Sequence, residues 1–174
     1  MELKHLYDMR KIYILLCSLV VNTFQLNAQK KITGNYHTYF GSMLEIHTDS
    51  TFKYSFHLDT ESSWVNGTWK VKKDTIYFTM IPIYDTITFR DNSQTLRIDS
   101  LVLSLDLISE RITSKERVNM FLTSYGQNRH SFPNKLFYKK NKLFYISNGK
   151  LVKGRTKGFW THKKYPTWYI RVPK

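Results

Sequence analysis

The sequence predicts an all-β fold, an antiparallel up-and-down meander that closes into a barrel. Residues 44–58 alternate between apolar and polar side chains, which is the period of a strand with one buried face. Turn signals recur along the chain and separate roughly eight to ten short strands, as in a sandwich or a barrel. We favour the barrel because closure removes exposed strand edges. Ala28 is the single alanine, and this composition argues against a helix bundle.

The clearest predicted hairpin turns at residues 49–51. Apolar side chains alternate with polar ones on both sides of this turn, so Ile46 and Tyr54 must face the same side of the sheet. We therefore expect a three-residue loop that pairs Ile46 with Tyr54. The same register pairs Leu44 with Phe56.

The preceding turn contains Gly41, and two loop lengths fit it. A three-residue loop turns three side chains inward: Tyr36, Thr38 and Phe40. A two-residue loop turns His37 and Tyr39 inward instead. We favour the three-residue loop because it buries two aromatic rings.

Shorter strands follow the second hairpin. A polar loop over residues 59–66 precedes a strand that starts at Gly67, and residues 72–74 form the next turn. Residues 75–80 predict a strand that ends before Pro82. Its inward side chains are expected to be Ile76, Phe78 and Met80.

Residues 86–90 and 95–105 predict two further strands. The second of them changes phase, because Leu96 and Ile98 share one parity whereas the later leucines share the other. A bulge or turn near Asp99-Ser100 would explain the change.

Residues 107–130 carry the weakest periodicity. Several apolar residues could line one face of a short helix: Ile108, Ile112, Val118, Phe121 and Leu122. Residues 118–123 could instead form a strand. We favour a helical or irregular crossing near 108–122, followed by a strand.

The C-terminal part predicts two tight turns and a closing strand. The first turn lies at residues 140–141. The second, at Asn148-Gly149, is the strongest turn signal, because both residues tolerate the positive φ of a type I′ turn. It pairs Ile146 with Leu151. Residues 168–172 predict the last strand.

Residues 1–28 predict a secretory signal peptide, with a basic start, an apolar core over residues 12–21 and Ala28 at the cleavage position. The apolar core is too short to span a bilayer. We therefore expect residues 29–174 to form a single exported domain without a transmembrane segment, in the periplasm, on the outer-membrane surface or outside the cell. Cys17, the single cysteine, belongs to the leader, so the exported domain has no thiol chemistry.

Charge is distributed unevenly along the chain. Residues 29–110 contain 8 basic and 10 acidic residues, whereas residues 111–174 contain 16 basic residues and one acid, Glu116. This asymmetry indicates either an anionic partner or a solubilising surface.

Several short motifs together carry a resemblance: Gly34-Asn35-Tyr36, Leu44-Glu45-Ile46, Asp49-Ser50-Thr51-Phe52 and Gly67-Thr68-Trp69. Over residues 29–106 the chain resembles the small exported lipocalin-like β-barrel proteins of Gram-negative bacteria, whose function is uncharacterised. The resemblance implies a lipocalin-like barrel and no catalytic residue. The chain departs from true lipocalins because Tyr36 stands where their first strand carries the tryptophan of G-x-W.

The inward aromatic residues could line a ligand cavity or fill a solid core. In the first case the domain is an exported binding module for a small apolar or amphipathic ligand. The residues expected to contact this ligand are Tyr36, Tyr54, Phe56 and Trp69. Tyr54 would be the polar contact, since a buried hydroxyl seeks a partner.

The alternative function is surface interaction with an anionic envelope polymer through the basic, aromatic C-terminal part. The cations expected to carry it are Lys139, Lys140, Lys153, Arg155, Lys163 and Lys164. The same lysines could equally form a solvated face over aromatic core residues. We do not expect nucleic acid as the partner of an exported protein, and the sequence leaves the oligomeric state open.

His37 and His47 are expected to lie opposite each other on the outer face, where they could begin a metal site or simply face solvent. No third ligand is evident beyond a possible Glu45, so we expect neither metal nor cofactor. The chain contains no G-x-S-x-G, H-E-x-x-H or phosphate-loop motif. We therefore expect no enzymatic activity.

Overall fold

The computed structural model describes residues 31–90, 97–122, 126–127 and 132–173. The chain is divided into two compact units, residues 1–33 and Gly34–Lys174. Of the first unit only residues 31–33 are described, so the predicted signal peptide over residues 1–28 lies outside the described residues. The second unit carries every described strand.

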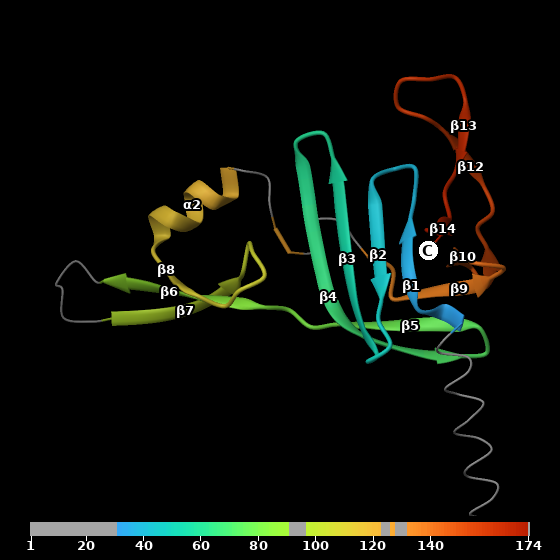
Figure 1. Cartoon of the computed structure of the whole chain (residues 1–174). Coiled ribbons are helices and arrows are strands. Elements are labelled where there is room, and N and C mark those ends of the chain that lie inside the picture. Colours follow the sequence, from blue (N-terminus) through green and yellow to red (C-terminus); the bar gives the residue numbers. More distant parts are fainter. Residues whose placement is uncertain (1–30, 91–96, 123–125, 128–131, 174) are drawn as a thin grey trace, which may run out of the picture. The chain divides into compact units, whose positions relative to one another are not determined.

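Eight strands form a closed barrel, which confirms the predicted all-β fold. They are β1 (Gly34–His37), β2 (Ser42–Ile46), β3 (Thr51–Leu58), β4 (Glu61–Lys72), β5 (Thr75–Met80), β9 (Lys135–Lys139), β10 (Lys142–Ser147) and β14 (Tyr169–Arg171). β5 pairs with β9, β9 with β10, β10 with β14 and β14 with β1, and every pair in the ring is antiparallel. The ring follows the chain order, with insertions after β5 and after β10 (Figure 1). The fold is therefore an up-and-down, lipocalin-like barrel.

The barrel interior is formed by side chains of alternating parity, as the sequence pattern predicts. The largest buried side chains come from all parts of the ring: Tyr36, Leu44, Ile46, Phe52, Tyr54, Trp69, Ile76, Phe78, Leu136, Tyr138, Leu143 and Tyr169. Phe132, just before β9, joins this core, with its ring centroid 4.7 Å from that of Tyr54 and 5.0 Å from that of Phe78. Met80, which we expected inward, is 45% exposed because it is the last residue of β5.

In the β2–β3 hairpin the side chains lie on the expected faces of the sheet, but the register of the two strands differs from the predicted one. Ile46 pairs with Phe52 and Leu44 with Tyr54, so the predicted pairs of Ile46 with Tyr54 and of Leu44 with Phe56 are wrong. The loop covers residues 48–50, one residue earlier than predicted, and His47 N donates to Thr51 O at 2.9 Å to close it, so each cross-strand partner shifts by two residues. A shift of two residues keeps every side chain on its own face, so the alternation could not exclude it.

The turn that sets this register is held by Asp49. Its Oδ1 accepts hydrogen bonds from Thr51 Oγ1 at 2.6 Å and from Thr51 N at 2.9 Å. These two bonds hold the pKa of the Asp49 carboxyl below its usual value. Ser50 takes the left-handed conformation, φ 66°, which completes the loop.

The β1–β2 turn is a three-residue loop, as favoured, but it covers residues 39–41, two residues earlier than the loop that would pair His37 with His47. Thr38 N donates to Ser42 O at 2.9 Å and closes it. Tyr36 and Thr38 are buried, whereas Phe40 is only half-buried. His37 pairs with Met43, so the expected position of His37 opposite His47 is wrong.

The predicted polar loop over residues 59–66 is wrong, because β4 begins at Glu61. Only Asp59 and Thr60 lie between β3 and β4, and Leu58 pairs with Glu61. The prediction of a loop relied on the polar residues of this segment. The structure buries three consecutive residues there: Ser62, Ser63 and Trp64. This part of β4 is covered on both faces, so its serines lie inside despite their type.

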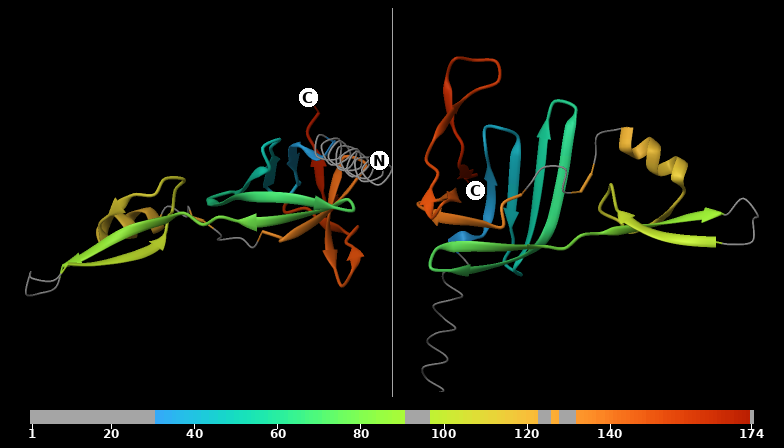
Figure 2. Two further views of the ribbon diagram at one scale, coloured as in Figure 1. Left: turned by 90° about the horizontal axis from the view of Figure 1, so that it is seen from below. Right: turned by 180° about the vertical axis from the view of Figure 1, so that it is seen from behind.

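The insertion after β5 forms a second, three-stranded sheet: β6 (Tyr84–Arg90), β7 (Arg97–Leu103) and β8 (Arg111–Ile112). Figure 2 shows β6 and β7 running side by side as one twisted ribbon. Their register is unbroken from Tyr84 opposite Leu103 to Arg90 opposite Arg97, so the predicted bulge near Asp99-Ser100 is wrong. The phase change arises because Leu101 and Leu103 are exposed on this ribbon.

A short helix is present, as favoured, but it starts later than residue 108. α2 (Ser114–Leu122) follows β8, and Thr113 caps it. Thr113 Oγ1 accepts from Glu116 N at 3.2 Å while Glu116 Oε2 accepts from Thr113 N at 2.7 Å, which is a capping box. Ile108 precedes the helix, Ile112 belongs to β8, and the side chains of Phe121 and Leu122 lie outside the described part. The favoured strand after the crossing falls largely outside the described residues, because only residues 126–127 are described between Leu122 and Phe132.

The insertion after β10 begins with the predicted turn at Asn148-Gly149 and the predicted pair of Ile146 with Leu151. Both turn residues have positive φ, 49° and 72°. β11 (Lys150–Leu151) completes this hairpin. β12 (Arg155–Lys157) and β13 (Lys164–Pro166) then form a second hairpin that the sequence interpretation missed.

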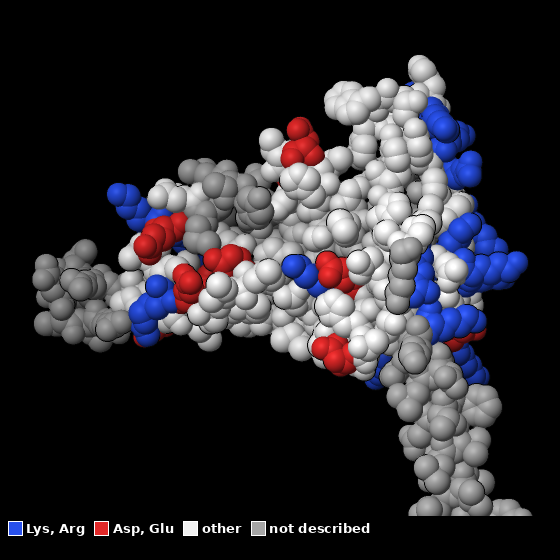
Figure 3. Space-filling model, in the orientation of Figure 1, with Lys and Arg blue, Asp and Glu red and all other residues white. Residues whose placement is uncertain are grey.

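Charge follows this architecture. In Figure 3, Lys and Arg side chains gather over the segment from β9 to β14, whereas Asp and Glu side chains lie mostly over the earlier strands. The uneven charge of the sequence thus becomes a basic region of the surface.

Candidate functional site

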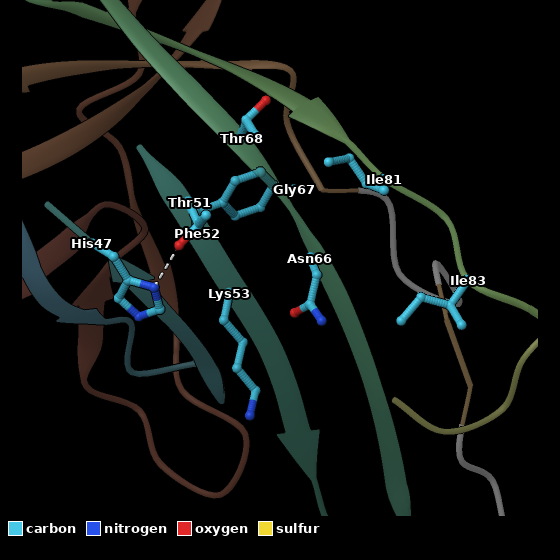
Figure 4. Close-up of a pocket in the computed structure, with 9 residues that line it drawn as sticks. All are labelled: His47, Thr51, Phe52, Lys53, Asn66, Gly67, Thr68, Ile81 and Ile83. Atoms are coloured by element: carbon cyan, nitrogen blue, oxygen red, sulfur yellow. Dashed lines mark hydrogen bonds between the residues drawn. The ribbon is translucent and has the colours of Figure 1, made fainter. Parts of the chain in front are cut away.

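A pocket of about 380 Å³ lies on the outer face of β3 and β4 (Figure 4). Two cross-strand pairs form its base, Lys53 with Asn66 and Thr51 with Thr68. The residues that line it are His47, Thr51, Phe52, Lys53, Asn66, Gly67, Thr68, Ile81 and Ile83. This volume falls in the range of small-molecule pockets, about 300–1,000 Å³.

The apolar part of the pocket depends on a glycine. A Cβ at Gly67 would lie 2.7 Å from Cε1 of Phe52 and 2.1 Å from the carbonyl oxygen of Thr79. Because Gly67 has no side chain, the Phe52 ring can pack directly beneath it. Ile81 and Ile83 provide the apolar wall, where the chain leaves β5.

The polar part of the pocket consists of Lys53 and Asn66. Asn66 Oδ1 is buried and has no hydrogen-bond partner among the residues that the structure describes. The backbone oxygen of Asn66 accepts from Ile81 N at 2.9 Å, which fixes Ile81 beside the amide. An unpaired buried acceptor is costly, so the site favours a ligand that donates a hydrogen bond.

His47 forms the third side of the pocket. Its Nδ1 lies 2.9 Å from Thr51 Oγ1, and its Nε2 lies 3.5 Å from Glu45 Oε2. Trp69 Nε1 donates to the carbonyl oxygen of His47 at 3.1 Å, which ties this end of the pocket to the barrel core. Within the described residues, no group of three or more His, Cys, Asp or Glu side chains could hold a metal ion.

The side chain of Gln127 forms hydrogen bonds with the backbone of Ile83, which belongs to the apolar wall of the pocket. Its Oε1 accepts from Ile83 N and its Nε2 donates to Ile83 O, both at 2.8 Å. Nε2 also donates to Ser104 O at 3.2 Å. A further hydrogen bond joins β4 to the segment after β7, since Trp64 Nε1 donates to Leu105 O at 3.2 Å. Ile83 is therefore positioned by contacts that are distant in the sequence.

The four residues expected to contact a ligand lie on the inward-facing side of the barrel strands. Tyr36, Tyr54 and Trp69 are buried, and Phe56 is half-buried. Tyr54 finds the hydroxyl partner that its burial required, Ser42 Oγ at 3.4 Å. The pocket of Figure 4 contains none of the four.

Other tyrosines continue this interior polar group. The Tyr145 hydroxyl donates to that of Tyr169 at 3.2 Å. Burial raises the pKa of Tyr54, Tyr145 and Tyr169, and most strongly that of Tyr169. These hydroxyls therefore remain protonated at neutral pH and act as neutral hydrogen-bonding groups.

The six predicted cations are divided between two places. Lys139 and Lys140 lie at the β9–β10 turn. The other four lie on or beside the β12–β13 hairpin: Lys153, Arg155, Lys163 and Lys164. β10 and β11 lie between the two groups in the sequence. All six side chains are exposed.

The fold places the chain in the class of closed, eight-stranded antiparallel barrels with a lipocalin-like meander. No family model, curated protein or solved structure matches the chain. Among the described residues, no helix has the length and apolarity needed to cross a bilayer.

Sequence reasoning missed the residues that define the pocket. Asn66 was assigned to a loop, and neither Ile83 nor Gln127 carried a distinguishing motif. In the sequence, Gly67 is the expected first residue of a strand and of the Gly67-Thr68-Trp69 motif, and neither assignment predicts a pocket. The available signal was the isolated glycine within a β pattern, because such a glycine often marks a close approach of other groups.

Proposed function

We propose that this protein is an exported, non-enzymatic binding module for a small amphipathic ligand, and that the ligand occupies the pocket on the outer face of β3 and β4. The observation that carries the proposal is the unpaired, buried Asn66 Oδ1 beside an apolar wall in a pocket of about 380 Å³. Apolar pockets with a few convergent polar groups are typical binding sites for small molecules.

The chemistry of the pocket defines the ligand class. The apolar part of the ligand would lie against Ile81 and Ile83. Its polar end would donate a hydrogen bond to Asn66 Oδ1 and could accept one from the ammonium group of Lys53. A small molecule with an aliphatic or aromatic body and an amide or hydroxyl group meets these requirements.

Export is part of the proposal and rests on the leader pattern of residues 1–28. The absence of cysteine after residue 28 suits a domain whose stability does not depend on redox conditions.

Native mass spectrometry of the protein recovered from an exporting host tests ligand retention. We expect an additional mass that is lost on denaturation. The double substitution Ile81→Ser with Ile83→Ser should weaken retention at least about tenfold, because burying one isoleucine contributes about 1.5–3 kcal/mol. Ile108→Ser, which changes an exposed isoleucine outside the pocket, is the matched control.

Phe56→Ala separates this pocket from a site inside the barrel. If retention is lost in Phe56→Ala and kept in the Ile81/Ile83 variant, the ligand lies in the interior and the outer-pocket proposal is wrong. A protein that carries no additional mass and binds no neutral fluorescent probe such as N-phenyl-1-naphthylamine would contradict both sites.

A further inference from the structure

The β12–β13 hairpin presents an unusual tip. Trp160 is 98% exposed and Phe159 beside it is 50% exposed. Both lie in the four-residue loop between Gly158 and Lys163, which extends the hairpin beyond its paired strands (Figure 1). Large exposed aromatic side chains that lie together mark interaction sites more often than solitary ones do.

Hydrogen bonds hold the loop at the tip in a defined conformation. The exposure of Trp160 is therefore a feature of a folded loop. Gly158 N donates to Lys163 O at 3.0 Å, and Lys163 N donates to Thr161 Oγ1 at 3.1 Å. Gly158 is packed tightly, since a Cβ there would lie 2.7 Å from Thr161 Cγ2. The loop backbone is therefore closed on itself, with Trp160 pointing away from it.

Aromatic packing fixes the hairpin, including Phe159 of its tip loop, to the β1–β2 turn. The rings of Tyr39 and Tyr165 stack with centroids 3.4 Å apart and planes 5° apart. Phe40 contacts Phe159 edge to face, at 5.5 Å and 80°. Thr167 N and Oγ1 both donate to Gly154 O, at 3.3 and 3.0 Å. The β1–β2 turn thus supports the hairpin, and Trp160 remains uncovered.

Cations surround this aromatic tip. Five exposed basic residues lie within residues 153–164: Lys153, Arg155, Lys157, Lys163 and Lys164. Lys157 and Lys164 face each other across the hairpin, and Lys163 Nζ lies 5.8 Å from the Tyr165 ring centroid. No acidic residue occurs after Glu116 in the sequence, so no carboxylate of the hairpin neutralises these charges.

We propose that the β12–β13 hairpin docks the protein on an anionic lipid surface, with Trp160 and Phe159 at the headgroup level. Tryptophan prefers the membrane interface, where its ring is apolar and its N–H stays hydrated. Basic residues beside it are attracted by anionic headgroups. An anionic lipid surface uses both features at once, whereas a soluble polyanion without apolar groups, such as polyphosphate, would use only the cations and leave Trp160 exposed.

Binding to vesicles tests this proposal. The probe is vesicles of equimolar phosphatidylglycerol and phosphatidylcholine in low salt, compared with pure phosphatidylcholine. We expect the protein recovered from an exporting host to sediment with the anionic vesicles, and quenching of tryptophan fluorescence by brominated acyl chains. Trp160→Ala should lower the partition coefficient at least about tenfold, because a tryptophan ring carries a large apolar area.

Three matched variants sharpen the test. Trp160→Phe should retain part of the binding, and Leu101→Ser, at a side chain 69% exposed on β7, should change nothing. Lys163→Gln with Lys164→Gln should weaken partition by about fivefold for each charge removed and flatten its salt dependence. Trp160 is almost fully exposed, so its replacement should leave the fold intact.

Equal partition of Trp160→Ala and the unchanged protein would overturn the proposal, as would equal binding to pure phosphatidylcholine. Binding to soluble polyphosphate or RNA, without quenching by brominated lipid, would overturn it in favour of a soluble polyanion. Loss of quenching confined to the Trp160 and lysine variants supports it.

Discussion

At the scale of single residues, Gly67 links the barrel core to the pocket on its outer face. Its missing side chain lets the Phe52 ring approach β4, and both residues line the pocket. Asn66, whose Oδ1 is buried, lies next to Gly67 in the sequence. Two neighbouring residues thus determine both the packing and the polarity of the candidate site.

Substituting Gly67 by alanine should destabilise the protein by about 1–3 kcal/mol, because the added methyl group collides with Thr79 O and with Phe52. Urea unfolding followed by tryptophan fluorescence measures the change. Gly154→Ala is the control, since a Cβ there meets nothing within 4 Å. Equal stability of the two variants would show that the strands separate easily at Gly67, contrary to the packing described.

At the scale of elements, the tight turns determine how the strands pair. Three of them use residues with positive φ at both central positions: Lys73-Asp74, Lys140-Asn141 and Asn148-Gly149. The β2–β3 turn differs, because Asp49 holds it through hydrogen bonds from Thr51. This turn decides the register that places Thr51 beside His47 in the pocket.

Replacing Asp49 by alanine should lower the free energy of unfolding at pH 7. The pKa of Asp49 is depressed in the folded state, so its contribution is present above the unfolded pKa of about 4 and is lost as the pH falls through the lower folded pKa. The stabilities of Asp49→Ala and the unchanged protein should therefore converge in acid. Urea titrations at pH 7 and in acid measure this, with Thr48→Ala in the same turn as the control. A constant difference at all pH values would show that the carboxylate is not responsible.

At the scale of the whole molecule, the barrel closes through its last strand, β14. Tyr36 of β1 pairs with Arg171, whose Cζ lies 6.0 Å from the Tyr36 ring centroid, and Tyr169 pairs with Leu143 of β10. Closure therefore buries tyrosines from several strands in one interior. Four of them have a raised pKa, mainly through burial: Tyr36, Tyr54, Tyr145 and Tyr169.

The stability of the barrel should consequently fall in alkali. The folded pKa of each of these tyrosines lies above the unfolded value of about 10, so stability is complete below pH 10 and decreases as the unfolded state loses protons first. Each tyrosine should contribute a slope of about 1.4 kcal/mol per pH unit above that point. Urea midpoints at pH 8, 10 and 11, with tyrosinate absorbance, measure this. A Tyr145→Phe variant should show a shallower decline, and an identical decline would contradict the assignment.

Local sequence determined the β class of this protein, the parity of its buried side chains and most of its tight turns. Period-two alternation from Leu44 to Leu58 and the Asn148-Gly149 pair suffice for these, because each depends on neighbouring residues. Burial of Tyr36, Tyr54 and Trp69 followed from the same parity.

Only the tertiary structure decided the register of the hairpins, the burial of the polar segment around Ser63 and the position of the pocket. A shift by two residues leaves parity unchanged, so the pattern could not choose between Phe52 and Tyr54 as the partner of Ile46. Trp64 is buried where the distant residues Leu105 and Gln127 contact β4, and Ser63 is buried on the opposite face of the strand. The pocket exists for the same reason, since contacts far apart in the sequence bring Ile83 beside Asn66, and no local pattern encodes which distant segments will meet.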